Sequence, residues 1–197
     1  MVEQTHGLKL SRRMMRIACL ILYAGLTICF SPSTPAASDE ATLEHRVKAA
    51  FLYKFASYVE WPERTFPRPD SPLTIAIIGA EAIAAELSQI VSGRAAQGRP
   101  VTVRRIRVGE SLAGTHILFI SAIDAERLAM VMQAARSQPI LVVTSSEGML
   151  SQGSMINFLP IERRLGFEIS LDNSRKSGLT LNSRLLAVAQ RVFTGAL

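Results

Sequence analysis

The sequence LTIAIIGAEAIAAELSQIV, residues 73–91, contains the feature that decides the fold, a buried strand followed at once by an amphipathic helix. Leu73 to Ile78 is a short, mostly apolar run that ends at Gly79, as in a strand covered on both faces. From Glu81 to Val91 the larger apolar residues recur at spacings of three and four, which is typical of a helix with one buried side. These residues therefore predict one unit of strand and helix.

The same alternation continues on both sides of this unit. The other predicted elements are a helix over 43–59 ended by Trp61-Pro62, strands over 101–108, 116–121 and 140–144, a helix over 124–135, a hairpin of strands 155–159 and 165–171 joined by 160–164, and a final helix over 183–193 capped by Asn182 or Ser183. Such alternation predicts a mixed, partly parallel sheet with helices on both faces. We expect residues 38–197 to form a single-domain α/β fold, a three-layer α/β/α sandwich.

The first 37 residues have the composition of a secretory signal peptide. Four basic residues are followed by Ile17–Phe30, 14 residues without a charge. That run is shorter than the about 20 residues of a membrane span and fits the apolar region of a signal peptide. Small residues follow in SPSTPAAS, so we expect export and cleavage near Ala36 or Ala37.

The export route stays open at this point. Ser11-Arg12-Arg13 matches a twin-arginine signal loosely, beside the general secretory route. Lipidation is disfavoured because Ile28, which is not a small residue, precedes Cys29. A retained membrane anchor would need a longer apolar run.

Removing this segment changes the charge and the cysteine content. The chain of 197 residues has 22 Lys and Arg against 16 Asp and Glu, a net charge of +6. Residues 38–197 keep 18 and 15, a net charge of +3, and Cys19 and Cys29 are both lost with the signal. The mature chain therefore has no disulfide and no thiol nucleophile or ligand. The cluster Arg104-Arg105-Ile106-Arg107 lies on a predicted strand, where successive side chains point to opposite faces, so we expect no nucleic acid partner.

No catalytic or cofactor motif is found. Gly93 and Gly98 have part of the spacing of a phosphate-binding loop, but Arg99-Pro100 stands where Lys and Ser or Thr are needed. There is no G-x-S-x-G motif, and two distant histidines without cysteine do not favour zinc. His116 is interpreted as a structural histidine with a satisfied hydrogen bond, with a ligand or base as the alternative. We expect no enzymatic activity, no metal and no cofactor.

Two stretches are unusual enough to suggest binding. Five aromatic residues fall within 51–61; Phe51, Phe55 and Tyr58 share a helical stripe and are assigned to the core, whereas Tyr53 and Trp61 are candidates for a partner surface. The second stretch is SSEGMLSQGSMINF, residues 145–158, which leaves one strand and enters the next, where open α/β sheets bind ligands. There Asn157 either bonds nearby backbone or contacts a ligand or partner. The candidate contact residues are Tyr53, Trp61, Gly153, Met155, Asn157 and Phe158.

Several segments occur together in a recognisable order. They are KAAFLYKFA (48–56), VEWP (59–62), Gly79, HILFIS (116–121), GSMINF (153–158), FEI (167–169) and the closing segment 178–186. In this order, over about residues 45–193, the chain resembles the YfiR-like family of small periplasmic proteins.

The resemblance implies a non-enzymatic α/β regulator in the periplasm. Members of the family bind the periplasmic sensing domain of an inner-membrane diguanylate cyclase and hold it inactive, which lowers cyclic di-GMP and biofilm output; a kinase sensor is another partner to consider. The resemblance also implies that a homodimer is to be considered. A small-ligand-binding module that feeds a membrane sensor is the alternative function.

The chain departs from the family at its cysteines. Relatives often have one beside the histidine of the HILFIS-like strand and others near the glycine loop, whereas this chain has Thr115 at the first place and none at the second. Ser154 also replaces the second glycine that is common in the family motif. Regulation through disulfides formed by those cysteines is therefore not expected here.

Overall fold

The computed structural model describes residues 36–136, 138–162 and 164–195. The predicted signal peptide lies outside the described residues, except for Ala36 and Ala37, so it stays a prediction. Among the described helices, none is both long and apolar enough to cross a membrane. The chain from Ser38 onward forms one compact unit.

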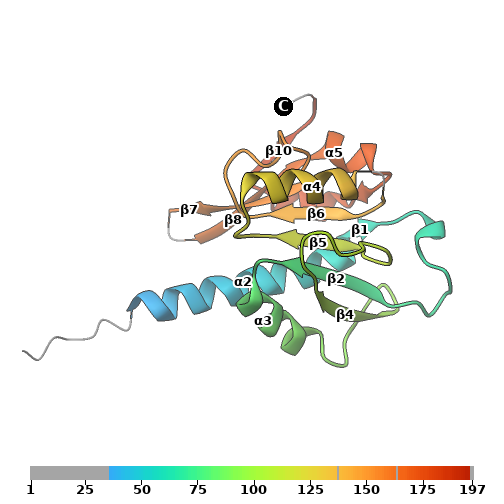
Figure 1. The fold of residues 1–197 in the computed structure, drawn as a ribbon, viewed down its shortest axis with the longest axis horizontal. Helices are drawn as coiled ribbons and strands as arrows, with labels where there is room; N and C mark the ends of the chain where they lie inside the picture. The colour runs from blue at the N-terminus through green and yellow to red at the C-terminus, as the bar shows by residue number, and fades with distance from the viewer. Residues whose placement is uncertain (1–35, 137, 163, 196–197) are drawn as a thin grey trace, which may run out of the picture. The chain divides into compact units, whose positions relative to one another are not determined.

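The centre of this unit is a mixed sheet of eight strands (Figure 1). In spatial order they are β10 (Arg191–Phe193), β8 (Arg164–Ser170), β7 (Ile156–Ile161), β6 (Leu141–Thr144), β5 (Ile117–Ile120), β2 (Leu73–Ile78), β4 (Arg99–Arg105) and β3 (Ala95–Ala96). Strands β4, β2, β5, β6 and β7 run parallel, whereas β8 is antiparallel to β7 and β3 to β4. The predicted mixed, partly parallel sheet is confirmed.

Helices cover both faces of the sheet. They are α2 (Ala36–Tyr58), α3 (Glu81–Val91), α4 (Ala125–Ala135), α5 (Leu171–Lys176) and α6 (Ser183–Ala187). Along β2, Ile75 and Ile77 pack in a cluster with α2 and α3, whereas Ala76 and Ile78 pack in a second cluster with α4. This alternation confirms the three-layer sandwich.

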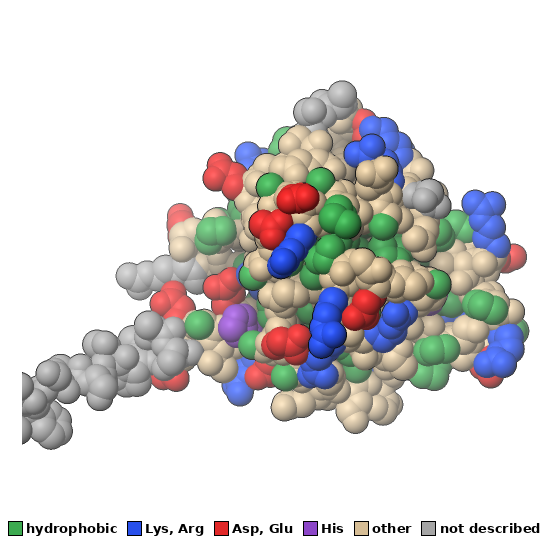
Figure 2. Space-filling model, in the orientation of Figure 1, with side chains coloured by type: hydrophobic (Ala, Val, Ile, Leu, Met, Phe, Trp, Pro, Cys, Tyr) green, Lys and Arg blue, Asp and Glu red, His purple; other side chains and the backbone are tan. Residues whose placement is uncertain are grey.

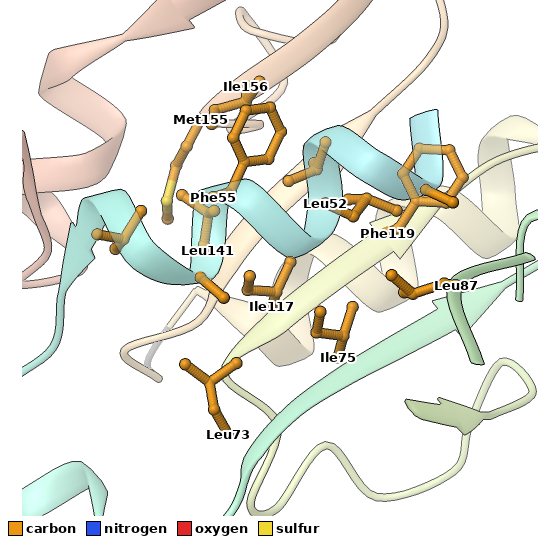
Figure 3. Packing of buried hydrophobic residues seen from close by; sticks show 14 of the residues in the cluster. Leu52, Phe55, Leu73, Ile75, Leu87, Ile117, Phe119, Leu141, Met155 and Ile156 are labelled. Carbon is orange, nitrogen blue, oxygen red and sulfur yellow. The ribbon is translucent and has the colours of Figure 1, made fainter. Parts of the chain in front are cut away.

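Helix α2 supplies the centre of the larger cluster. Leu52 and Phe55 have no exposed surface and lie over Ile75, Ile117 and Leu141 (Figure 3). The predicted aromatic stripe follows the same face, with Phe51 and Tyr58 partly buried beside Phe55. Because α2 crosses this face of the sheet, its two ends lie at opposite ends of the parallel strands.

The predicted final helix is wrong in its second half. Helix α6 ends at Ala187, and Arg191–Phe193 forms β10, parallel to β8. The backbone N–H of Gln190 donates to the carbonyl of Phe167 at 2.8 Å, which starts this pairing. Hydrogen bonds to the open edge of β8 thus stabilise this segment as a strand more than a longer α6 would stabilise it as a helix.

Other boundaries differ by smaller amounts. Helix α2 ends at Tyr58 rather than Val59, because Val59 and Glu60 form β1 and pair with β9 (Thr180–Leu181). The predicted strand over 101–108 is β4, shifted toward Arg99 by its register with β2. The hairpin turn is two residues long rather than five, since Glu162 adopts a left-handed backbone conformation with φ of 52°.

Candidate functional site

The predicted contact residues do not form one cluster. Trp61 follows β1, near the point where β5 begins. Tyr53 lies earlier in the chain, on helix α2. Gly153 lies in the turn before β7, whereas Met155, Asn157 and Phe158 are buried in or beside that strand. The predicted contact residues therefore lie in several separate regions of the domain.

Trp61 belongs to a packed group of rings that we call the aromatic platform, formed by Trp61, Phe66, Arg99 and His116. The indole Nε1 of Trp61 donates to the carbonyl of His116 at 3.2 Å. The Phe66 ring stacks on the His116 ring, with centroids 4.5 Å apart and an interplanar angle of 12°. Trp61 meets both rings edge-on. The four side chains therefore hold one another in fixed orientations.

Arg99 fixes the outer part of the platform. Its guanidinium carbon lies 3.8 Å from the centroid of the Phe66 ring, a cation–π contact. Its Nη1 also donates to the carbonyls of Arg68, Pro69 and Ser71, at 3.0, 2.7 and 3.1 Å. The proline-rich loop before β2 is thereby tied to the start of β4.

His116 is the most deeply buried member of the platform and is 3 % exposed. Its Nδ1 accepts a hydrogen bond from the backbone N–H of Thr74 at 3.0 Å, which assigns the proton of the neutral ring to Nε2. Burial, and secondarily the charge of Arg99, lowers the pKa of His116 to about 4. The structural hydrogen bond predicted for this residue is present at Nδ1, whereas Nε2 has no partner among the described residues.

Tyr53 connects α2 to the edge of the sheet. Its hydroxyl donates to the carbonyl of Ala95 in β3 at 3.0 Å, and the guanidinium of Arg94 lies over its ring. In the turn that follows β3, the Gln97 amide donates to the carbonyls of Ala56 and Val59 at 2.8 and 2.6 Å. Tyr53 is therefore partly engaged within the fold, and its role as a partner contact stays a prediction.

Met155, Asn157 and Phe158 point into the protein. Phe158 is 2 % exposed and packs against Phe55, with ring centroids 5.9 Å apart. Met155 is also buried, in the same cluster. Only a small part of each of these two side chains is exposed, so their contact role stays a prediction.

Asn157 is the centre of a buried polar network. Its Oδ1 accepts from the Thr144 hydroxyl at 2.9 Å and from the backbone N–H of Ser146 at 3.2 Å. Its Nδ2 donates to Glu168, whose other oxygen pairs with Arg191 at 3.1 Å. Asn157 thus bonds nearby backbone, which was one of its two predicted roles.

Gly153 lines a small cavity of about 340 Å³ between the last turn of α4 and the end of α5. Its φ of 110° is unfavourable for other residues, and a side chain would crowd Met132. Met155, Arg136 and Lys176 line the same cavity. The structure therefore brings two of the predicted residues to one surface depression, on the α4 side of the sheet.

A larger groove of about 740 Å³ includes Ser145 and Phe158 from the predicted stretch 145–158, whereas its side formed by α2 was not predicted from the sequence. It lies between the first turns of α2 and the hairpin of β7 and β8, where β5 and β6 end. Leu43, the first residue of the predicted helix over 43–59, is 62 % exposed at this groove. The signal that could have revealed it is the acidic sequence around Leu43, with Glu40 and Glu44, which is unusual for a buried helix face.

Charge is mixed over the visible surface. Lys and Arg side chains alternate there with Asp and Glu, and hydrophobic atoms lie between them (Figure 2). Seven ion pairs join acidic and basic side chains among the described residues. No group of three or more potential metal ligands is present among the described residues.

The fold and these surfaces define a small α/β sandwich that presents a rigid aromatic platform and an open groove, both suited to binding. A family model described as YfiR/HmsC-like matches residues 45–190, and the chain belongs to this family. Members of this family are periplasmic regulators in diguanylate cyclase pathways rather than enzymes. The resemblance stated from the sequence motifs is confirmed.

Proposed function

We propose that this protein is a non-enzymatic regulator of the periplasm that binds the sensing domain of an inner-membrane signalling protein, in the first instance a diguanylate cyclase, and holds it inactive. The observation that carries this proposal is the match to the YfiR/HmsC-like family over residues 45–190, nearly the whole described domain. Export of the chain, with cleavage near Ala36 or Ala37, is part of the same proposal.

The mechanism we propose is linkage between binding and conformation. A regulator that binds one conformation of the sensing domain more tightly than another shifts the partner toward that conformation. The size of the shift is set by the ratio of the two affinities, and it acts in both directions. No covalent step is needed, so the regulator requires only a specific and rigid contact surface.

The aromatic platform is our candidate for that surface. Trp and Arg are the residue types most enriched among those that dominate binding energy. Trp61, Phe66 and Arg99 are half-buried and are held by hydrogen bonds and ring contacts, so little conformational freedom would be lost on binding. Such preorganisation supports a contact role for Trp61 better than for the buried residues of β7.

Replacement of Trp61 by Ala tests this assignment. We expect the affinity for the partner's periplasmic domain to fall about 30-fold or more, the effect of removing a dominant contact. Phe193→Ala is the matched control, because Phe193 is also half-buried but lies on β10 at the far edge of the sheet. Affinity would be measured by calorimetry and stability by thermal unfolding. A large loss of stability with unchanged affinity would assign Trp61 to the core alone.

A further inference from the structure

The groove beside α2 has the position of a ligand site in an open α/β sheet. Ser121 follows the carboxyl end of β5, Ser145 follows that of β6, and both line the groove. Ligands of such sheets bind in the crevice outside the carboxyl ends of the parallel strands. The volume of about 740 Å³ lies within the range of small-molecule pockets.

One side of the groove is apolar. Helix α2 contributes Leu43, Val47 and Phe51, and the hairpin of β7 and β8 contributes Leu165 together with Pro160. Leu43 is 62 % exposed, whereas Phe51 already packs on the core. An occupant with an apolar body would cover Leu43 and remove this side chain from water.

The inner part of the groove holds a buried cation. The side chain of Lys48 is 10 % exposed, and its Nζ donates to the Ser145 hydroxyl at 2.7 Å. Its ion-pair partner is Glu44, one helical turn earlier, at 2.6 Å. The side chain of Glu44 is 50 % exposed, so its carboxylate can move into water without a large change in its solvation. Lys48 therefore has an exchangeable anionic partner on the groove side.

The remaining charges of the groove limit the kind of anion that fits. Glu40 and Glu162 lie on its rim, and Arg164 is the other basic residue that lines it. These rim acids disfavour a ligand with several negative charges, because like charges repel across the groove. A single carboxylate head reaches the one buried lysine at the lowest electrostatic cost.

We propose that this groove binds a small amphiphile with one carboxylate head and an unbranched apolar body, and that the head takes the place of Glu44 at Lys48. The ligand carboxylate accepts from Lys48, and its apolar body lies along Leu43 and Val47. This site is at the opposite end of α2 from the aromatic platform, and it does not depend on the proposed regulatory function.

Calorimetric titration with three probes of equal chain length tests the proposal. Decanoate, decanol and decyltrimethylammonium share one apolar body and differ in head charge. The two ionic probes are used below their micelle concentrations, and decanol is used below its solubility limit. We expect decanoate to bind about tenfold or more tightly than decanol, because a charge-assisted hydrogen bond to a buried cation is gained. The cationic probe should bind weakest.

Variants separate the lysine from general hydrophobic binding. Lys48→Met keeps an unbranched side chain and should reduce decanoate binding to the level of decanol, whereas Lys54→Met, an exposed lysine of the same helix, should change nothing. Glu44→Gln removes the competing carboxylate and should tighten decanoate binding, which gives a second test if Lys48→Met does not fold. The proposal would be overturned if decanoate did not bind or if the three probes bound with equal affinity. It would also be overturned if neither Lys48→Met nor Glu44→Gln altered decanoate binding. Affinity for the protein partner, measured without decanoate, is independent of these outcomes.

Discussion

The two ends of helix α2 differ in how completely they are enclosed by the rest of the domain. At the C-terminal end, Gln97 bonds the last carbonyls, Tyr53 bonds β3, and Trp61 bonds the carbonyl of His116. At the N-terminal end, Leu43 is exposed and Lys48 is held by one hydroxyl and one half-exposed carboxylate. The helix therefore runs from an open groove at its N-terminal end toward the aromatic platform, which lies beyond its C-terminal end.

These two surfaces suit different partners. A rigid surface of aromatic and guanidinium groups favours a preorganised contact with another protein. An open groove with an exchangeable ion pair favours a small ligand instead.

The largest expected effect concerns the sheet beneath the open groove. Gly79 has φ of 74°, and a Cβ atom there would overlap the carbonyl oxygen of Ser121. We expect Gly79→Ala to lower the free energy of unfolding by about 4 kcal/mol, through backbone strain and displacement of the strand end. Gly148→Ala is the control, because Gly148 has the same φ but open space around it, and should cost only about 1 kcal/mol. If the two variants lose the same free energy of unfolding in urea, the end of β2 tolerates a Cβ atom as well as the open turn at Gly148 does.

The next effect is a pH dependence at the enclosed end. The pKa of His116 is about 4 in the folded protein and near 6.5 in the unfolded chain, so the unfolded state takes up a proton first as the pH falls. The stability contributed by neutral His116 is fully present above pH 6.5, is lost between pH 6.5 and 4, and amounts to about 3 kcal/mol.

Chemical unfolding at pH 7.5, 5.5 and 4.5 checks this dependence. His116→Asn should flatten the curve relative to the wild-type protein, because Asn does not titrate. If the His116→Asn variant keeps the wild-type curve, the platform is not the source of acid sensitivity.

The smallest expected effect is at the open end. Leu43→Ala should change the free energy of unfolding by less than about 0.5 kcal/mol, since an exposed side chain loses little burial. Leu52→Ala, nine residues later on the same helix and fully buried, should cost about 3 kcal/mol. A similar cost for the two leucines in thermal or urea unfolding would contradict an open N-terminal end.

Elements dominated by local pattern could be predicted well from the sequence. The strand Leu73–Ile78 and the helix Glu81–Val91 have the predicted boundaries, because strand and helix periodicity both end there at Gly79 and after Val91. Asn182 caps α6 as one of the two predicted caps, through its bond to the N–H of Arg184. In these places local sequence and tertiary structure favour the same conformation.

Features that depend on distant partners could not be predicted in this way. β10 forms only because β8 offers an unpaired edge, and the segment Ser183–Phe193 carries no local sign of that edge. The aromatic platform joins Trp61, Phe66, Arg99 and His116 from four separate segments, so only Trp61 stood out in the sequence. The burial of Phe158 likewise follows from its contacts with α2, which strand alternation does not specify.

The most direct test of the regulatory proposal is site-specific photo-crosslinking in cells. A photoreactive residue at exposed Glu63, two residues after Trp61, would probe the platform, and one at exposed Gln133 on α4 would probe the opposite face of the sheet. We expect a membrane protein with a diguanylate cyclase domain to be captured from Glu63 and not from Gln133. Capture of that protein from Gln133 alone, or of no membrane signalling protein from either position, would contradict the account.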